Sequence, residues 1–365
     1  MSDLIVNFNL GETALGYLTS SVQFGFILGT LSFAILSIAD RFSPSKVFFS
    51  CAILGGIFNL GIIWGENSMG SILLLRFLTG FFLAGIYPVG MKIASDYFDK
   101  GLGKSLGFLV GALVVGTAFP HLLKQLTSDF SWVSVLLSTS TLSVLGGLLM
   151  LALVPDGPYR KPSQKLDLSA SIHVFKNKEF RSAAFGYFGH MWELYTFWAF
   201  VPIMLIQYAS LHAGVNFNIP VLSFMIIGIG GLACVLAGYI SELLGTKKTA
   251  ITALALSCLC CLLSPFIFMV QLQGVFIGFL LFWGMVVIAD SPLFSTLVAQ
   301  NATPEFRGTA LTIVNCIGFS ITIISIQLLA ALNAVSDSIY VYTVLAIGPI
   351  LGLIALLKIE NRRDA

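Results

Sequence analysis

Phe185-Gly-Tyr-Phe-Gly-His-Met-Trp-Glu-Leu-Tyr-Thr-Phe-Trp198 is the stretch of this sequence that decides the fold. It belongs to an apolar segment, residues 183–206, of about 24 residues, which is long enough for a helix to cross a bilayer. The stretch also contains His190 and Glu193. Ionisable groups at that depth are costly and usually face a water-filled path, a substrate or a partner, so both residues are predicted to be functional.

The rest of the chain has the same apolar character. Its 365 residues are 57% hydrophobic and only 10% charged, with a mean hydropathy of +0.94. Long apolar runs recur from end to end, and a backbone exposed to lipid must satisfy its own hydrogen bonds. The sequence therefore predicts an all-α polytopic membrane protein that has the lipid bilayer as a partner. The net charge of +2 gives no reason to expect nucleic-acid binding.

The cysteines and the catalytic motifs give no reason to expect a cofactor, a metal site or an enzyme. All six cysteines fall inside apolar runs, where cysteine acts as a small hydrophobe. The cluster at Cys258, Cys260 and Cys261 has no histidine at ligand spacing, so we expect it to pack and not to bind metal. The chain contains neither a phosphate-binding loop nor a nucleophile elbow, which argues against an ATP-driven pump or a hydrolase.

Hydropathy windows of about 19 residues predict eleven transmembrane spans. They are residues 17–39, 47–64, 71–93, 104–123, 131–154, 183–206, 218–241, 248–269, 274–298, 308–331 and 338–357. We therefore expect an N-terminal bundle of five helices, residues 1–154, and a C-terminal bundle of six, residues 183–358. A cytoplasmic linker, residues 155–182, would join them, and a cytoplasmic tail, residues 359–365, would follow.

The positions of Lys and Arg predict the orientation, because loops rich in these residues stay in the cytoplasm. With the N-terminus outside, 17 of the 19 basic residues fall on the cytoplasmic side, and only Arg76 and Lys124 fall elsewhere. A miscounted span would destroy this alternation. The sequence therefore predicts an odd number of spans and a cytoplasmic C-terminus. It also predicts a multi-pass protein of the plasma membrane, which in bacteria is the inner membrane.

The two halves of the chain repeat each other at a separation of 202 to 205 residues. Ser37–Lys46, after the first span, corresponds to Gly238–Lys248, after the seventh. Two spans later, Gly85-Ile-Tyr-Pro88 corresponds to Ala289-Asp-Ser-Pro292. The sixth span then has no counterpart. The chain therefore looks like two six-helix repeats that lack the first helix.

These loops resemble the signature loop of the major facilitator superfamily of secondary transporters, an acidic residue followed by basic residues. The second copy matches that pattern at Gly238, Glu242, Gly245, Lys247 and Lys248. The first copy keeps Asp40, Arg41 and Lys46 but has Leu36 and Ser43 where glycines are usual. Arg76 and Gly80 are similar to the Arg-x-x-x-Gly signature of the family's fourth helix. The resemblance covers essentially the whole chain and implies the family's two-bundle, twelve-helix plan without its first helix.

Gly189–Tyr195 and Ala289–Ser295 resemble a branch of that superfamily that is loosely related to nitrate, nitrite and cyanate carriers. The superfamily's nitrate carriers have arginines on the second and eighth helices. The corresponding spans here, residues 17–39 and 218–241, contain no arginine. We therefore do not predict nitrate as the substrate.

His190 and Glu193 are three residues apart and so share one face of their helix. Burial disfavours a charged carboxylate, and an imidazole titrates near physiological pH. The two are therefore predicted to be a proton-binding pair. The alternative is a neutral, hydrogen-bonded pair that only holds helices together.

Asp290 and a set of aromatic residues are the next candidates. Asp290 follows Trp283 by seven residues, or two helical turns, so both face the same side. Pro292 suggests a locally opened helix that lines a cavity, as broken helices do in transporters. Asp290 is therefore a third candidate for proton coupling, or else it braces the inner gate. Trp192, Tyr195 and Trp283 are predicted to line the substrate path.

Arg76 is predicted to lie about 9 Å below the outer end of its span, at about 1.5 Å per residue. A permanently charged guanidinium at that depth needs an anionic partner. That partner is either a carboxylate or phosphate of the substrate, or an acid on a neighbouring helix, and both alternatives stay open.

The charged residues of the two repeated loops are predicted to form an inside gate, with charge pairs that hold the halves together when the carrier faces outward. They are Asp40, Arg41, Glu242, Lys247 and Lys248.

The resemblance implies a secondary transporter that moves a small solute by alternating access of two bundles. Arg76 favours an anionic solute, and the titratable candidates favour proton coupling. We expect a monomer with no cofactor and no enzymatic activity. Two alternatives stay open: a proton-driven drug exporter, and a non-transporting membrane sensor or assembly factor with a carrier-like fold.

Overall fold

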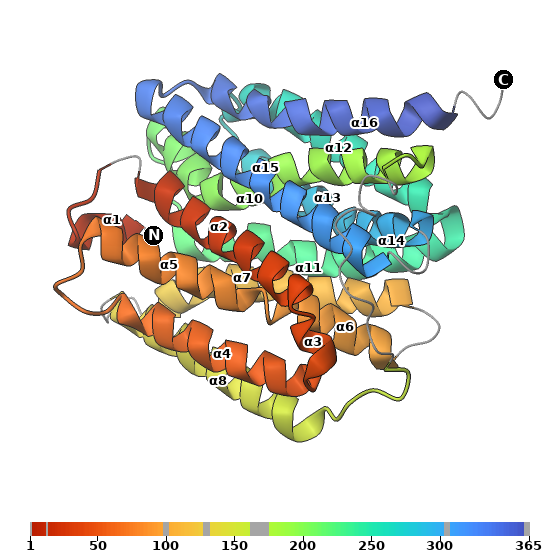
Figure 1. Ribbon diagram of the computed structural model, residues 1–365. Helices are drawn as coiled ribbons and strands as arrows, with labels where there is room; N and C mark the ends of the chain where they lie inside the picture. The colour runs from red at the N-terminus through yellow and green to blue at the C-terminus, as the bar shows by residue number, and fades with distance from the viewer. Residues whose placement is uncertain are drawn as a thin grey trace. The chain divides into compact units, whose positions relative to one another are not determined.

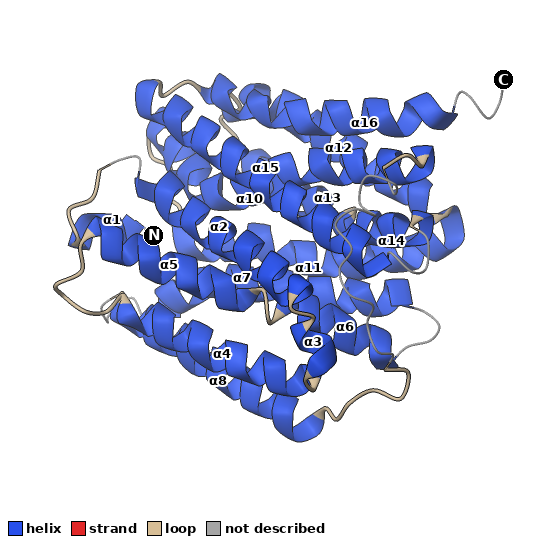
Figure 2. Cartoon of the chain, viewed as in Figure 1, coloured by secondary structure: helices blue, strands red, loops and turns tan. Residues whose placement is uncertain are grey.

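The computed structural model describes residues 2–11, 14–97, 102–126, 132–160, 175–302 and 307–360. Among these residues the chain forms helices and connecting loops, and Figure 2 shows no strand. The chain divides into two compact units. The first unit holds Met1–Ser105 and Leu126–Asp167, and the second holds Leu106–Gln125 and Leu168–Ala365.

The helices of the first unit are labelled in Figure 1. They are α1 (Ser2–Asn7), α2 (Ala14–Ile35), α3 (Ile38–Arg41), α4 (Pro44–Gly61), α5 (Met69–Leu83), α6 (Tyr87–Tyr97) and α8 (Val133–Leu153). α2 packs along α5, and α4 packs along α8. The short helix α1 precedes the first predicted span.

The second unit contains most of α7 (Leu102–Leu126) and all of the helices that follow α8 (Figure 1). These are α10 (Lys178–Leu211), α11 (Ile219–Leu244), α12 (Thr246–Phe268), α13 (Gln273–Ala289), α14 (Ser291–Asn301), α15 (Arg307–Val335), the 3-10 helix η2 (Ile339–Ala346) and α16 (Ile347–Glu360). The predicted grouping into bundles of five and six helices stays a prediction.

Eleven segments of the described chain are long and apolar enough to cross a membrane, and each overlaps one of the eleven predicted spans. The all-helical fold and the spans are therefore confirmed. Three of the spans each consist of two helices in succession. Met69–Ala94 contains α5 and most of α6, Gln273–Asn301 contains α13 and α14, and Ile339–Lys358 contains η2 and most of α16.

α10 is longer than the span predicted for it, at 34 residues. It begins earlier because the side chain of Asn177 accepts hydrogen bonds from the backbone N–H groups of Glu179 and Phe180. At about 1.5 Å per residue the helix is about 51 Å long. It is therefore longer than a hydrocarbon core of about 30 Å is thick, so its ends extend beyond the core.

The two units contain a helix break at the corresponding place in the repeat. In the first unit α5 ends at Leu83, and three residues of turn precede α6. In the second unit α13 ends at Ala289, Asp290 forms the turn, and α14 begins at Ser291. Pro88 and Pro292 lie at the second position of the following helices, where a missing N–H leaves no hydrogen bond unmade. The opened helix predicted at Asp290 is confirmed.

Glycines allow the helices next to these breaks to cross with their backbones in contact. A Cβ on Gly80 of α5 would lie 2.0 Å from the carbonyl oxygen of Val22, and one on Gly284 of α13 would lie 2.0 Å from that of Ile226. Both residues of the second pair follow those of the first by 204 positions. The internal repeat predicted from the sequence is thus reproduced as a helix crossing, between α2 and α5 in one unit and between α11 and α13 in the other.

Within the second unit, α7 and α11 also approach closely. A Cβ on Gly111 would lie 2.8 Å from the carbonyl oxygen of Gly231, and one on Gly231 would lie 2.9 Å from that of Gly111. Small residues at such a crossing let transmembrane helices gain van der Waals contact, which drives their association in lipid.

We expect Gly284→Ala to destabilise the protein by about 1–3 kcal/mol, because the added methyl group forces α13 away from α11. A Cβ on Gly278, on the same helix, would have no atom of a neighbouring helix within 4 Å. Gly278→Ala is therefore the matched control and should be neutral or stabilising by up to about 1 kcal/mol. Thermal unfolding in detergent, followed by size-exclusion chromatography, measures both. Equal unfolding temperatures for the two variants would contradict the close crossing.

Candidate functional site

The buried face of α10 carries the two ionisable residues that the sequence singles out. The side chains of His190 and Glu193 are each only 1% exposed. Gly189, one residue before His190, brings this part of α10 against α16, because a Cβ there would lie 2.4 Å from the carbonyl oxygen of Gly348. The close packing of α10 therefore keeps both residues away from lipid and water.

Glu193 accepts hydrogen bonds from two other helices. The indole N–H of Trp283, on α13, donates to Glu193 Oε1 over 2.6 Å. The hydroxyl of Ser257, on α12, donates to the same oxygen. The Cys261 thiol, one turn after Ser257, is a further neighbour of this carboxyl. The carboxyl of Glu193 is therefore held by side chains from both α12 and α13.

The imidazole of His190 pairs with Asp290, which lies at the break between α13 and α14. His190 Nδ1 is 2.8 Å from Asp290 Oδ1, and Asp290 is completely buried. His190 Nε2 and Asp290 Oδ2 make no hydrogen bond to the described part of the protein. The direct partner of His190 is therefore Asp290, an acid at the end of another helix, and the predicted proton-binding role of His190 and Glu193 stays a prediction.

The three side chains form one buried ionisable group in the interior of the second unit. Asp290 is close enough to Glu193 for their charges to interact. A protonated His190 beside an ionised Asp290 carries no net charge, and a protonated Glu193 adds none. Burial of an uncompensated charge is expensive. The group therefore changes its proton content only if something else, such as a solute or a conformational change, compensates for the change in charge.

The aromatic candidates separate into different environments. Trp283 is fully buried, donates to Glu193 and packs against Phe197 with ring centroids 4.7 Å apart. Trp192 donates its indole N–H to the carbonyl oxygen of Val344 in η2 over 3.0 Å. Tyr195 lies with its ring centroid 5.3 Å from that of Phe319 in α15. The contacts of Trp283, Trp192 and Tyr195 are therefore with α10, η2 and α15 respectively, and their roles in substrate binding stay predictions.

Arg76 lies in the middle of α5, in the first unit. Its Nε atom is buried and has no hydrogen-bond partner in the described part of the chain. The acid on a neighbouring helix that the sequence left open as its partner is not found among the described residues. The guanidinium therefore has hydrogen-bonding capacity to spare.

The residues predicted to form the inside gate lie at helix ends. Gly245 alone connects α11 to α12, with a φ of 90° that glycine adopts without strain. Glu242 and Lys248 are exposed on either side of this turn, and Lys247 is half-buried. In the first unit Arg41 is exposed at the end of α3, and the side chain of Asp40 lies outside the described residues.

Sequence reasoning missed a polar contact beside the gate in the first unit. The carboxylate of Asp156 accepts a hydrogen bond from Ser43 over 2.7 Å and pairs with Arg160, which also donates to the carbonyl oxygen of Phe42 over 2.9 Å. The start of the predicted linker is therefore bound to the loop before α4. The four-residue spacing of Asp156 and Arg160 is a signal that could have found this pair.

Sequence reasoning also missed the partners of Glu193. Ser257 and Cys261 are four residues apart on α12, so they share a face, but nothing in the sequence relates that face to α10.

Comparison with protein-family models matches residues 1–326 to the model of the Major Facilitator Superfamily. A search of the curated proteins finds no match.

We expect Ser257→Ala to destabilise the protein by about 1–3 kcal/mol, because it removes a donor from the buried carboxyl of Glu193. Ser264→Ala is the matched control on the same helix, since Ser264 is equally buried but donates only to the carbonyl oxygen of Cys261 over 2.8 Å. It should cost less than about 1 kcal/mol. Thermal unfolding of the two variants in detergent measures the difference. A cost for Ser264→Ala that matches or exceeds that for Ser257→Ala would contradict the role of Ser257.

Proposed function

The chain belongs to the Major Facilitator Superfamily and is a multi-pass membrane transporter, and on this premise we propose that it couples the movement of a small solute to protons. Transport would occur by alternating access, with two helical bundles moving about a central site. The family membership supports the transporter. The proton coupling is our inference from the interior of the second unit.

The observation that carries this proposal is the buried group of Glu193, His190 and Asp290. Two carboxyls and an imidazole without contact to water serve no purpose in packing, since apolar residues of the same size would fill the space at less cost. Ionisable groups inside membrane segments mark proton and ion paths. Glu193 and His190 remain the leading proton carriers, and Asp290, the direct partner of His190, remains the third candidate.

Arg76 supports an anionic solute as the substrate. Its unpaired buried Nε atom offers a fixed donor. A planar guanidinium with free donors suits a carboxylate or a phosphate. Trp192, Tyr195 and Trp283 stay candidates for contact with the less polar part of the solute.

The remaining elements of the proposal rest on the sequence. They are an inside gate that includes Asp40, Arg41, Glu242, Lys247 and Lys248, a cytoplasmic C-terminus and linker, a location in the bacterial inner membrane, and a monomeric state. A kinship with the branch near nitrate, nitrite and cyanate carriers also belongs to it.

We expect Glu193→Gln to abolish proton-driven transport, because the amide keeps the hydrogen bonds from Trp283 and Ser257 but cannot release a proton. Uptake and efflux in vesicles under an imposed pH gradient, against a panel of carboxylates, phosphate esters and neutral solutes, measures this. Glu66→Gln, in an exposed loop, is the control and should leave transport unchanged. Undiminished coupled transport by Glu193→Gln would show that Glu193 does not carry the coupled proton. If the wild-type protein is folded and inserted but moves no solute of the panel, the result favours the alternative of a non-transporting membrane sensor or assembly factor.

We expect Arg76→Lys to weaken binding of an anionic solute about tenfold and Arg76→Ala about a hundredfold, because the first loses the guanidinium fork and the second the charge as well. Binding to the protein in detergent measures both. Solutes of the same size without charge are the control, and their affinity should not fall in this order. An equal loss of folded protein in both variants would instead identify Arg76 as a structural residue.

A further inference from the structure

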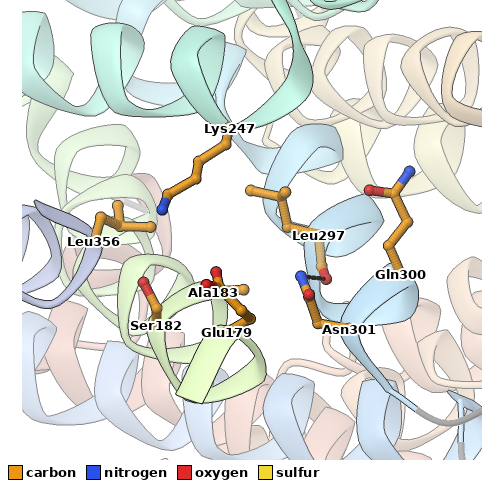
Figure 3. A pocket seen from close by; sticks show the side chains of 8 residues that line it. All are labelled: Glu179, Ser182, Ala183, Lys247, Leu297, Gln300, Asn301 and Leu356. Carbon is orange, nitrogen blue, oxygen red and sulfur yellow. Dashed lines mark hydrogen bonds between the residues drawn. The ribbon is translucent and has the colours of Figure 1, made fainter. Parts of the chain in front are cut away.

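A polar pocket opens at the end of the second unit where α10 begins. Its volume is about 230 Å³. Figure 3 shows Lys247 reaching from α12 toward α10, opposite Gln300 and Asn301 of α14. Glu179, at the first turn of α10, is exposed at its rim, and Ser182 is buried at its wall. In the predicted orientation this end of the unit faces the cytoplasm.

The floor of the pocket lies on the same helix faces as the buried proton-binding group. Ala183 and Leu297 are buried residues of the lining. Ala183 precedes His190 by seven residues on α10, and Leu297 follows Asp290 by seven. Seven residues are about two helical turns, or about 10 Å, and residues at that spacing share one face. The pocket and the His190–Asp290 pair are therefore aligned along the interior of the unit.

One aromatic side chain, that of Phe294, lies between them. Phe294 is completely buried, with its ring centroid 6.2 Å from that of His190. On the pocket side, Gly186 makes room for it, because a Cβ on Gly186 would lie 2.5 Å from the ring and 3.0 Å from Leu356. Leu356 is also a lining residue of the pocket. The ring of Phe294 therefore separates the pocket from the pair.

Behind this ring, two polar atoms are available to a proton carrier. His190 Nε2 and Asp290 Oδ2 have no hydrogen-bond partner in the described part of the protein. A space opened beside them would have polar walls, which is what a chain of water molecules requires.

We propose that the pocket is a proton-exchange site, joined to the His190–Asp290 pair by a route through the interior of the second unit that Phe294 closes. A hydronium ion in the pocket gives its proton, through water admitted when the ring moves, to Asp290 or to His190 Nε2, and is left as water. The reverse transfer releases the proton. Glu179 and Lys247 are the charged residues lining the pocket, and Glu193 is the further titratable group beside the pair. The inference rests on the proposed proton coupling and adds the side from which protons enter.

The test replaces the ring in the full-length protein. Phe294→Ala should let protons cross proteoliposomes without any solute, at a rate about tenfold above wild type, since the space left by the ring admits water. A trapped pH dye and a potassium–valinomycin potential provide the readout and the driving force. Phe276→Ala is the matched control, because Phe276 is equally buried and stacks on Tyr208 at 3.9 Å, away from the pair. If Phe294→Ala does not fold, Phe294→Leu should give a smaller leak of the same kind.

Two further variants locate the leak. Adding Asp290→Asn and His190→Gln to Phe294→Ala should abolish it, because the proposed route then lacks the pair that accepts the proton at its inner end. Adding Gln300→Cys instead, at an exposed position of the lining, should make the leak sensitive to a charged, membrane-impermeant thiol reagent, whereas Phe294→Ala alone should be insensitive, since all six native cysteines are buried.

Each contrary result overturns the route. These results are a folded Phe294→Ala and Phe294→Leu without a leak, a leak equal to that of Phe276→Ala, a leak that survives loss of the pair, and a leak that the reagent does not block. The failure of the route is distinguishable from that of the proposed function. If Glu193→Gln loses coupled transport while vesicles with Phe294→Ala show no proton leak, the route is refuted but the proposed proton coupling is not. If Glu193→Gln retains coupled transport, the role of Glu193 is refuted but the route past Phe294 is not.

Discussion

The cost of burying charge is the constraint on which the rest of the second unit depends. Glu193, His190 and Asp290 lie in an interior where an uncompensated charge is expensive. Each therefore has a partner from another helix: Trp283 and Ser257 for Glu193, and Asp290 for His190. The partners come from α12, α13 and the break before α14, while Glu193 and His190 lie on α10. The hydrogen bonds and the ion pair of the group therefore depend on how these four helices pack. A change in its proton content is therefore linked to their arrangement.

The fold positions this group with two simple devices. Asp290 is the turn residue between α13 and α14, and it therefore lies at a helix break inside a membrane span. Glycines at the crossing of α11 and α13 bring the backbones into contact, which leaves no room for lipid or water between them. Both devices occur in the first unit as well, at residues 84–86 and at Gly80. The acid does not recur there, so among the described residues the duplicated architecture carries a buried ionisable group of this kind in one unit only.

Much of this could be predicted from the sequence. The eleven spans follow from runs of apolar residues, because a lipid-exposed helix must be apolar along its length. The break at Asp290 follows from Pro292, and the repeat from the constant separation of the two loops. That His190 and Glu193 are functional is a hypothesis that the sequence suggests and that stays a prediction. Their partners could not be predicted, since the spacing of the two residues on one helix face does not show which side chains of other helices they meet.

The sequence by itself determined which segments enter the membrane, where the helices break, and which residues are too polar to be there without a reason. These properties are local, because they depend on hydropathy and on the backbone preferences of proline and glycine over a few residues. Only the tertiary structure decided that Asp290 meets His190, that Trp283 and Ser257 hold Glu193, and that Phe294 lies between the pair and the pocket. The hydrogen bonds of Glu193 with Ser257 and Trp283 and the pairing of His190 with Asp290 join residues 64 to 100 positions apart. Several helices with similar apolar faces could have supplied them, and only the close crossings of this fold select which ones do.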